Sequence, residues 1–421
     1  MKYEYKNIFG DVVFKQSDSP VMKERLKKDA EKIVDRISKY PETPAEAISR
    51  LATMKEPKWR VPGPTGLMGT FALHDAGIDL LEACYDPDRL VAAQFHVCQT
   101  LKHEFPQADY DVYNIEAEAL GCKLLRSPTN YASVAPGGEI IKEKEDLDKL
   151  RVPDFETEGR GSYFRGIMEN YFDTAKGVVT PFYFHITPWD IAFKTMPWTK
   201  LIKWARKDPE FMWRALDFFV EIAKEYGRFQ YEEVVKPHAP TLLPFMWAAA
   251  CDIPLIGLKN WEQYAMPAAM KVIKQIPYDS WGVFRFYETQ EDWKALWKKY
   301  MENSGPIVFM YGMDTRVADL AEAKKITRAH KKFFVVGTDA ETINYSAMEI
   351  LDARLRRHIR DTAPGGGSIP VKLDTVSPAC SRERFEYMIK KVKEYGTYPI
   401  DVEGLQDTES TGGIQKGRGV F

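Results

Sequence analysis

The chain has 421 residues, of which 44% are hydrophobic and 29% are charged, with a formal net charge of −2. Basic residues are spread along the chain and matched by acidic ones, which excludes a nucleic-acid footprint, and the apolar runs stay short of the roughly 20 residues that a membrane helix needs. Five separated cysteines without a Cys-x-x-Cys pair, and a charged start without an apolar segment, predict a protein of the reducing cytoplasm.

The first 60 residues predict an N-terminal arm followed by helices at 22–39 and 45–54. The stretch 57–66 is rich in proline and glycine, so we expect a loop without regular structure there. Beyond it, the pattern predicts a strong helix over 86–105 and a short strand over 110–115.

From residue 177 onward, stretches rich in β-branched and aromatic residues alternate with helical patterns. The expected strands are 178–185, 241–246, 283–287, 306–311, 333–337 and 368–373. The expected helices are 208–235, 261–276, 291–302, 318–330, 345–362 and 382–395. So many β-then-α units favour an α/β fold, a (β/α)8 TIM-like barrel with an N-terminal helical extension, over an open doubly wound sheet.

This pattern divides the chain into three parts: an arm with helices at 1–60, a barrel at 61–398 and a tail at 399–421. The tail is rich in glycine, threonine and serine, and we expect it to be disordered or to lie as a strap across a neighbour. We also allow for a homodimer.

The expected barrel predicts where the site residues lie, because the catalytic residues of such folds are found where strands end and loops begin. Arg285 and Tyr287 lead the set, since residues two apart on one strand leave the same face of the sheet. The other candidates at strand ends are Asn114, Glu116, His185, Asp190, Met246, Trp247 and Asp374. Each has a structural alternative: an arginine can pair with a surface carboxylate, and an aspartate such as Asp314 or Asp339 can cap the next helix.

Five stretches of the chain, within about 64–395, resemble the uroporphyrinogen decarboxylase superfamily. They are Glu116–Cys122, Thr187–Trp189, Asp208–Glu210 with its long helix, Ala318–Lys324 and 363–395. The resemblance implies a distorted (β/α)8 barrel, in agreement with the alternating strands and helices. The first and fourth stretches look more like the corrinoid-linked methyltransferase branch, of the methylcobamide:coenzyme M or O-demethylase type, than like the decarboxylases.

Two departures from the family pattern change what the resemblance implies. Decarboxylases carry an arginine-rich stretch that binds the porphyrin carboxylates, but 63–68 has no arginine, so porphyrinogen is not the expected substrate. The methyltransferases hold zinc with a His-x-Cys pair and a further cysteine, and the matching positions here are Arg285, Tyr287 and Asp374. A guanidinium is always protonated and cannot bind a metal, so we expect no metal and no tightly bound cofactor. The alternative zinc ligands are Cys251 and Cys380 with His185 or Glu288.

Three functions stay open at this point. In the first, Arg285 and Lys194 anchor a small anionic substrate, an aromatic compound or an ether, and a methyl group passes to a corrinoid carried by a partner protein or to another acceptor, or moves in the reverse direction. In the second, a metal-free decarboxylase or lyase acts on an aromatic or polycarboxylic acid. The third is a ligand-binding relative without catalysis. The catalytic candidates are Tyr287, Asp374, Glu116 and His185, and the substrate-binding candidates are Arg285, Lys194, Trp247, Met246, Asn114 and Asp190.

Overall fold

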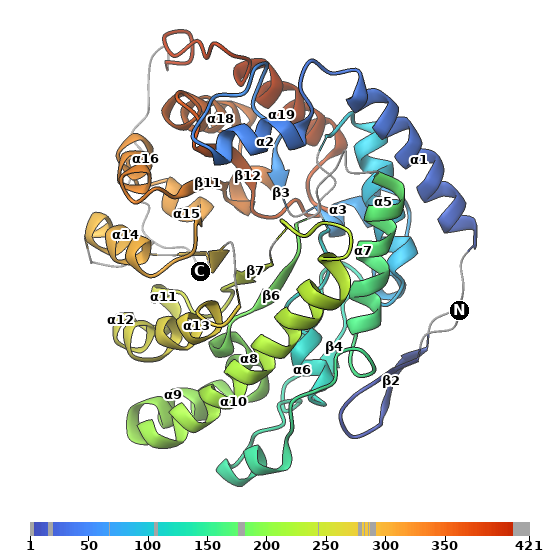
Figure 1. Ribbon diagram of the computed structural model, residues 1–421, viewed down its shortest axis with the longest axis vertical. Coiled ribbons are helices and arrows are strands. Elements are labelled where there is room, and N and C mark those ends of the chain that lie inside the picture. Colours follow the sequence, from blue (N-terminus) through green and yellow to red (C-terminus); the bar gives the residue numbers. More distant parts are fainter. Residues whose placement is uncertain are drawn as a thin grey trace.

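In the computed structural model, helices surround a core of parallel strands (Figure 1). The structure describes residues 4–15, 20–66, 68–104, 108–175, 182–242, 244–276, 280–281, 283–284, 286 and 292–406. The strands are β1 (Glu4–Lys6), β2 (Val12–Lys15), β3 (Thr65–Gly66), β4 (Leu124–Leu125), β5 (Ser133–Val134), β6 (Phe184–Ile186), β7 (Phe245–Trp247), β8 (Ser280–Trp281), β9 (Val283–Phe284), β10 (Ile307–Met310), β11 (Phe333–Thr338) and β12 (Ser368–Leu373).

The other regular elements of the described chain are helices, most of them α-helices. The α-helices are α1 (Pro20–Ser38), α2 (Pro44–Ala52), α3 (Gly69–Asp75), α4 (Leu80–Ala83), α5 (Pro87–Thr100), α6 (Ile115–Ala119), α7 (Gly161–Ala175), α8 (Pro188–Thr195), α9 (Trp198–Lys207), α10 (Pro209–Arg228), α11 (Ile253–Ile256), α12 (Leu258–Asn260), α13 (Met266–Ile273), α14 (Trp293–Glu302), α15 (Gly312–Thr315), α16 (Leu320–Ala329), α17 (Ala340–Asn344), α18 (Met348–Thr362) and α19 (Arg382–Tyr395). A 3-10 helix, η1 (Lys144–Lys149), and two π-helical turns, η2 (Phe229–Val235) and η3 (Trp261–Ala265), complete the set.

The barrel wall consists of two parallel sheets that share one strand position. Five strands pair in the order β3-β12-β11-β10-β9, and three pair in the order β6-β7-β8. β8 pairs with β7 and β9 pairs with β10, and the two strands follow each other closely in the chain, so the two sheets meet at this position of the wall. The predicted (β/α)8 barrel is therefore confirmed as the fold.

The remaining wall position, between β3 and β6, is filled by an irregular segment. A strand was expected over 110–115, and this prediction is wrong: all six residues are described, none is in a strand, and α6 begins at Ile115. The Tyr110 hydroxyl donates to the Phe184 carbonyl (2.5 Å) and accepts from the Phe184 amide (3.1 Å). A side chain, rather than a backbone ladder, thus ties this segment to β6.

Several predicted elements agree with the structure. β12 and α19 have the expected bounds, and β10, β11, α16 and α18 differ by a few residues at their ends. The expectation of a loop without regular structure over 57–66 is wrong at its end, because β3 (Thr65–Gly66) pairs there with β12. The predicted tail lies outside the described residues from 407 onward.

Helix α2 closes the N-terminal end of the barrel. It starts in a capping box, in which the Thr43 hydroxyl accepts from the Glu46 amide (3.2 Å) and the Glu46 carboxylate accepts from the Thr43 amide (2.8 Å). Ile48 and Ala52 of this helix line a cavity of about 60 Å³ together with side chains of the barrel interior. The open end of the barrel is therefore the opposite one.

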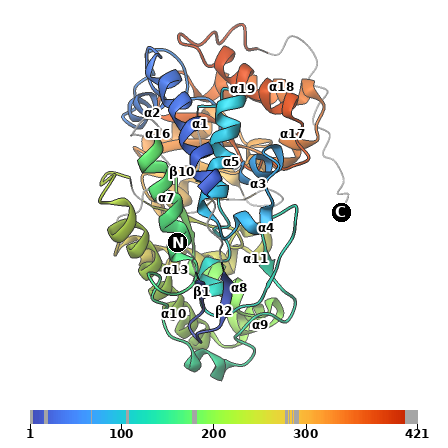
Figure 2. The same ribbon diagram turned by 90° about the vertical axis from the view of Figure 1, so that its right-hand side faces the viewer.

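At that opposite end, short helices follow the strands. α3 follows β3, α8 follows β6, α11 follows β7, and α15 and α17 follow β10 and β11. Figure 2 shows α3, α11 and α17 together toward the right-hand side of the molecule. This is the carboxyl end of the parallel strands, where barrel enzymes carry their active sites. Within the described part of the chain, no helix is both long and apolar enough to cross a bilayer.

Candidate functional site

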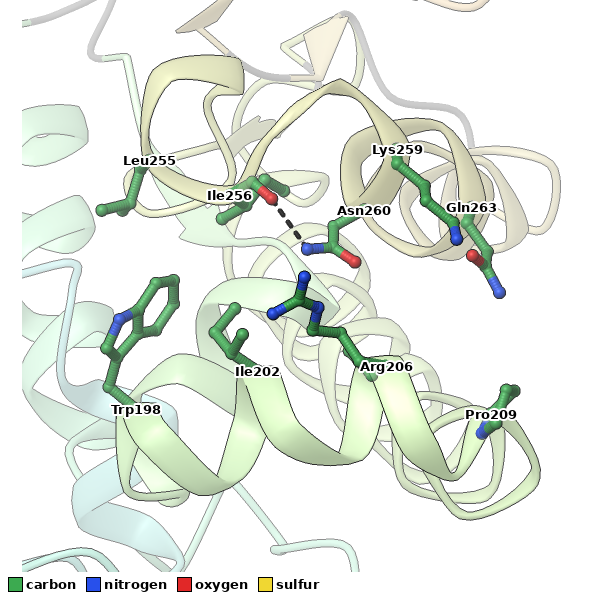
Figure 3. Close-up of a pocket in the computed structure, with 10 residues that line it drawn as sticks. Trp198, Ile202, Arg206, Pro209, Leu255, Ile256, Lys259, Asn260 and Gln263 are labelled. Carbon is green, nitrogen blue, oxygen red and sulfur yellow. Dashed lines mark hydrogen bonds between the residues drawn. The ribbon is translucent and has the colours of Figure 1, made fainter.

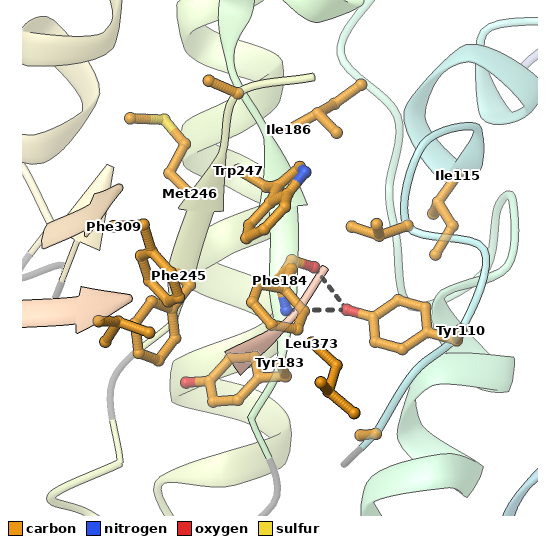
Figure 4. Close-up of a cluster of buried hydrophobic side chains, with 14 of the residues drawn as sticks. Tyr110, Ile115, Tyr183, Phe184, Ile186, Phe245, Met246, Trp247, Phe309 and Leu373 are labelled. Atoms are coloured by element: carbon orange, nitrogen blue, oxygen red, sulfur yellow. Dashed lines mark hydrogen bonds between the residues drawn. The ribbon is translucent and has the colours of Figure 1, made fainter. Parts of the chain in front are cut away.

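Side chains from four strands meet in the centre of the barrel. The Trp247 indole lies 5.4 Å from the Phe184 ring and 5.8 Å from the Phe309 ring, both edge to face. Figure 4 shows Trp247 close to Phe184, and Phe309 beside Phe245. The Lys372 ammonium lies 4.9 Å from the Trp247 ring centre and 6.0 Å from that of Phe309. A cation within about 6 Å of an aromatic face is attracted to it, so these rings form an apolar wall beside a positive charge.

Lys372 is the buried cation of this centre. Its residue is 3% exposed, and its Nζ donates to Asp374 Oδ1 at 3.0 Å. This is its one hydrogen bond with the described residues, although an ammonium has three donors. The remaining donors can bind an anion that enters the barrel.

Asp374 is held between two neighbours at the end of β12. Its Oδ2 accepts from the Gly312 amide at 2.7 Å, while its Oδ1 faces Lys372. A Cβ on Gly337 would lie 2.8 Å from Oδ1 and 2.7 Å from the Gly312 nitrogen, so this close approach requires glycine. Burial raises the pKa of the Asp374 carboxyl, and the Lys372 charge acts against that shift. The carboxyl can therefore hold a proton more readily than an exposed aspartate.

The irregular segment carries two further titratable groups of this region. Asp109 accepts from the Gly69 amide at 2.5 Å, and burial raises its pKa to about 7, more than Lys372 lowers it. Burial and the Asp109 carboxylate raise the pKa of Tyr113, which stays protonated. Of these side chains, Asp109 has a pKa that suits proton donation near neutral pH.

Glu116 and Asp190 lie in the wall rather than in the centre. Glu116 Oε1 accepts from the Ile186 amide (3.3 Å), and Oε2 has no hydrogen bond with the described residues. Burial raises the pKa of Glu116 to about 8. Asp190 accepts from the Thr187 hydroxyl (2.6 Å) and from the Ala249 amide (3.1 Å), so it joins the start of α8 to the loop after β7. The substrate-binding role expected for Asp190 stays a prediction beside these contacts.

Asn114 and Lys194 flank the same wall. The Asn114 amide donates to Asp111 Oδ1 (2.7 Å) and to the Ala132 carbonyl (2.7 Å). Lys194, on α8, is half-buried; burial lowers its pKa, and the Asp111 and Asp190 carboxylates act in the opposite direction. Neither side chain contacts the Lys372 centre in the described structure.

The remaining candidates lie either on the side of the sheet that faces the helices or outside the residues that the structure describes. His185 pairs with Met246 across β6 and β7, and its ring lies 6.5 Å from that of Tyr226 on α10. Paired residues of parallel strands leave the same face, so both side chains point away from the barrel centre, toward the helices. Arg285 and Tyr287 lie outside the described residues, and their roles stay predictions.

No described residues form a group of three or more His, Cys, Asp or Glu side chains that could hold a metal. Of the alternative zinc ligands, Cys251 lies beside the Thr187 hydroxyl, 3.8 Å from Oγ1, and the Cys380 thiol donates to the Ser381 carbonyl. His185 faces the helix layer, and Glu288 lies outside the described residues.

Lys372, Asp109 and Tyr113 were missed when the candidates were chosen from the ends of predicted strands. Lys372 did carry a signal, because it is the one charged residue in the six-residue strand Ser368–Leu373. A lone lysine in a buried strand has to face a partner or a cavity. Asp109 and Tyr113 belong to a segment without a regular strand pattern, and their sequence gives no comparable signal.

The raised pKa of Glu116 predicts a pH-dependent stability. Its carboxyl keeps a proton up to about pH 8 when folded but loses it near 4.5 when unfolded, so stability falls as the pH rises between these values. Glu116→Gln removes this contribution. We expect the variant to gain stability relative to the parent by a few kcal/mol between about pH 5 and pH 9 in urea denaturation, since each pKa unit corresponds to about 1.4 kcal/mol. A difference that is the same at every pH would show that Glu116 does not titrate.

Comparison with known proteins adds a family and a fold. The family model described as uroporphyrinogen decarboxylase (URO-D) matches residues 43–395. No curated protein matches the chain. A solved methyltransferase from Methanosarcina mazei is similar in structure, with a TM-score of 0.67 and 15% sequence identity, over 84% of this chain and 99% of that chain. At this identity the likeness concerns the fold.

Proposed function

Since this chain belongs to the uroporphyrinogen decarboxylase (URO-D) family, we propose that it is a methyltransferase-like enzyme that acts on a small anionic substrate in the barrel mouth. The substrate is an aromatic compound or an ether, and the methyl acceptor is a corrinoid carried by a partner protein. The structural likeness to a methyltransferase supports the choice of reaction within the family.

The buried ammonium of Lys372 is the observation that carries this proposal. It makes one hydrogen bond with the described residues, which leaves donors for a ligand, and it lies beside the faces of Trp247 and Phe309. A carboxylate or phenolate would take up these donors, and the rings would cover the flat body of an aromatic substrate. Hydrogen bonds to a charged group are stronger in a water-poor site, so Lys372 anchors the substrate in place of, or together with, the predicted Arg285.

Asp374 is the group placed to protonate the leaving oxygen. When the methyl–oxygen bond breaks, the methyl group passes to the acceptor, and the oxygen keeps the electron pair and needs a proton. Burial raises the pKa of Asp374, which favours the protonated carboxyl, and Lys372 then stabilises the carboxylate that remains. Tyr287 stays the alternative acid.

The described residues do not fit the zinc site of the family methyltransferases. Of the three matching positions, Asp374 is described, and the Lys372 ammonium lies 3.0 Å from its carboxylate. A dication bound there would be repelled by this fixed positive charge. The proposed reaction therefore does not use zinc.

A metal-free decarboxylase or lyase is the second candidate. The observation in its favour is that Asp109, with a pKa of about 7, lies in the same mouth as Lys372. The cation would hold a carboxylate of the substrate, and a protonated carboxyl would deliver the proton that replaces carbon dioxide. A ligand-binding relative without catalysis is the third reading.

These readings are separated by assaying the purified protein with methoxylated benzoates. We expect methyl transfer to cob(I)alamin, supplied in place of the corrinoid protein, with formation of the corresponding hydroxybenzoate. Release of carbon dioxide without added corrinoid would replace the first reading by the second. Tight binding of the acids without either product would leave the third.

The metal content of the protein gives a separate prediction. We expect far less than one zinc per chain in elemental analysis and unchanged turnover after treatment with a chelator, because Lys372 opposes a dication at Asp374. One zinc per chain that is lost in Cys380→Ser would contradict this and would support the alternative ligand set of Cys251 and Cys380.

A further inference from the structure

A pocket of about 550 Å³ lies outside the barrel, between α9 on one side and α11, α12 and η3 on the other (Figure 3). α9 lies in the segment that connects β6 to β7, and α11 and α12 lie in the segment that follows β7. Its volume is within the range of about 300–1,000 Å³ that is usual for small-molecule sites. None of its lining residues is among the side chains of the barrel mouth.

One end of this pocket is apolar. Figure 3 shows the Trp198 indole and the Leu255 side chain facing each other at this end, with Ile202 beside them on α9. Leu255 is 46% exposed, which is unusual for a large aliphatic side chain in a concave site. An exposed leucine and a half-buried tryptophan that line a cavity gain stability when an apolar body covers them.

The other end carries two exposed cations, Arg206 and Lys259. Arg206 projects from α9 to the centre of the pocket, and Lys259 projects from the opposite wall beside Gln263 (Figure 3). Neither cation makes an ion pair or a hydrogen bond with the part of the chain that the structure describes, and no carboxylate is among the lining residues. By contrast, Lys200 on the same helix pairs with Glu143 at 2.6 Å.

We propose that this pocket binds a small amphipathic anion: a carboxylate, sulfonate or phosphate group on an apolar, preferably aromatic, body. The anionic group lies between Arg206 and Lys259, where the guanidinium can bind it through two donors, and the Gln263 amide supplies another donor. The apolar body lies against Trp198 and Ile202. The occupant would bridge the segment that carries Asp190 and the loop whose Ala249 amide donates to Asp190, so this is a second site, separate from the reaction in the barrel.

The test uses 1-anilinonaphthalene-8-sulfonate as the anionic probe and N-phenyl-1-naphthylamine, which has the same rings without the sulfonate, as the neutral one. Fluorescence titrations of both probes are made with the full chain and with Arg206→Glu, Lys259→Glu and Lys203→Glu. Lys203 is an exposed cation of α9 that does not line the pocket, so its variant is matched in charge change. Ile202→Trp fills the apolar part, and circular dichroism checks that each variant is folded.

We expect Arg206→Glu and Lys259→Glu each to weaken binding of the anionic probe at least about tenfold, the effect of one charge-assisted hydrogen bond, and Lys203→Glu to weaken it less than about twofold. Binding of the neutral probe should be unchanged in the charge variants, and Ile202→Trp should abolish binding of both probes.

Equal losses in Arg206→Glu and Lys203→Glu would reveal diffuse charge attraction and would overturn the proposal. So would an unchanged affinity in Arg206→Glu together with a loss in Lys372→Met, because the probe would then occupy the barrel mouth. Self-association that Ile202→Trp abolishes would assign the pocket to a second copy of the chain instead.

Discussion

Replacing Lys372 by methionine is expected to lower kcat/KM for the methoxylated acid by about ten- to a hundredfold, because a charge-assisted hydrogen bond is worth about 1.5–3 kcal/mol. Methionine has a similar length and keeps the apolar contact with Trp247 and Phe309. The ammonium that holds the anionic group is lost, and substrate affinity should fall with kcat/KM. Measurements of substrate Kd, kcat/KM and Tm on the same protein check this.

The melting temperature distinguishes an anchoring role from a structural one. Without Lys372, the buried Asp374 carboxyl can fold in its protonated form, since burial already raises its pKa, so Tm should change little below neutral pH. Lys372→Arg is the matched control, because it keeps the charge but places a larger, planar group between the rings. A lower Tm in Lys372→Met with unchanged kcat/KM would make the lysine a structural partner of Asp374 and would remove the basis for an anionic substrate.

How much of the barrel could be predicted depended on how far each element is determined by its own residues. β12 and α19 have apolar runs and clear starts, such as Ser381 before α19, whose hydroxyl accepts from the Arg384 amide at 3.2 Å. β3 has two residues, and its strand character comes from pairing with β12, its neighbour in the barrel wall. Such pairing joins positions more than 300 residues apart, so a local pattern in the sequence cannot reveal it.

The candidate site was predictable in part for a similar reason. Trp247 and Asp374 were chosen from the ends of strands, and the structure brings both to Lys372. His185 and Met246 were chosen in the same way, but the alternation of side chains places them on the helix-facing side. The end of a strand fixes how far a residue lies along the barrel. Whether its side chain faces the barrel interior or the helices depends on the register of that strand. Lys372 lies two residues before Asp374, and its long side chain lets the ammonium reach that carboxylate.

Replacing Arg160 by leucine is expected to reduce the free energy of unfolding by about 3–5 kcal/mol, because removing one member of a buried ion-pair network leaves uncompensated charges. The Arg160 side chain is 0% exposed, and its guanidinium lies 2.8 Å from the Asp111 carboxylate and 2.7 Å from that of Glu118. Its Nη1 also donates to the Cys84 carbonyl at 3.2 Å. Leucine fills part of the volume but neutralises neither carboxylate. Urea denaturation at neutral pH measures the loss.

Arg126→Leu is the matched control. Arg126 lies 3.3 Å from the same Glu118 carboxylate, but 36% of its side chain is exposed, and without it the carboxylate keeps its ion pair with Arg160. Asp111 also accepts from Asn114 in the irregular wall segment that carries Asp109, so Arg160→Leu should lower activity as well as stability, whereas Arg126→Leu should change neither much. Equal losses of stability in the two variants would mean that the buried network does not hold the wall segment in place.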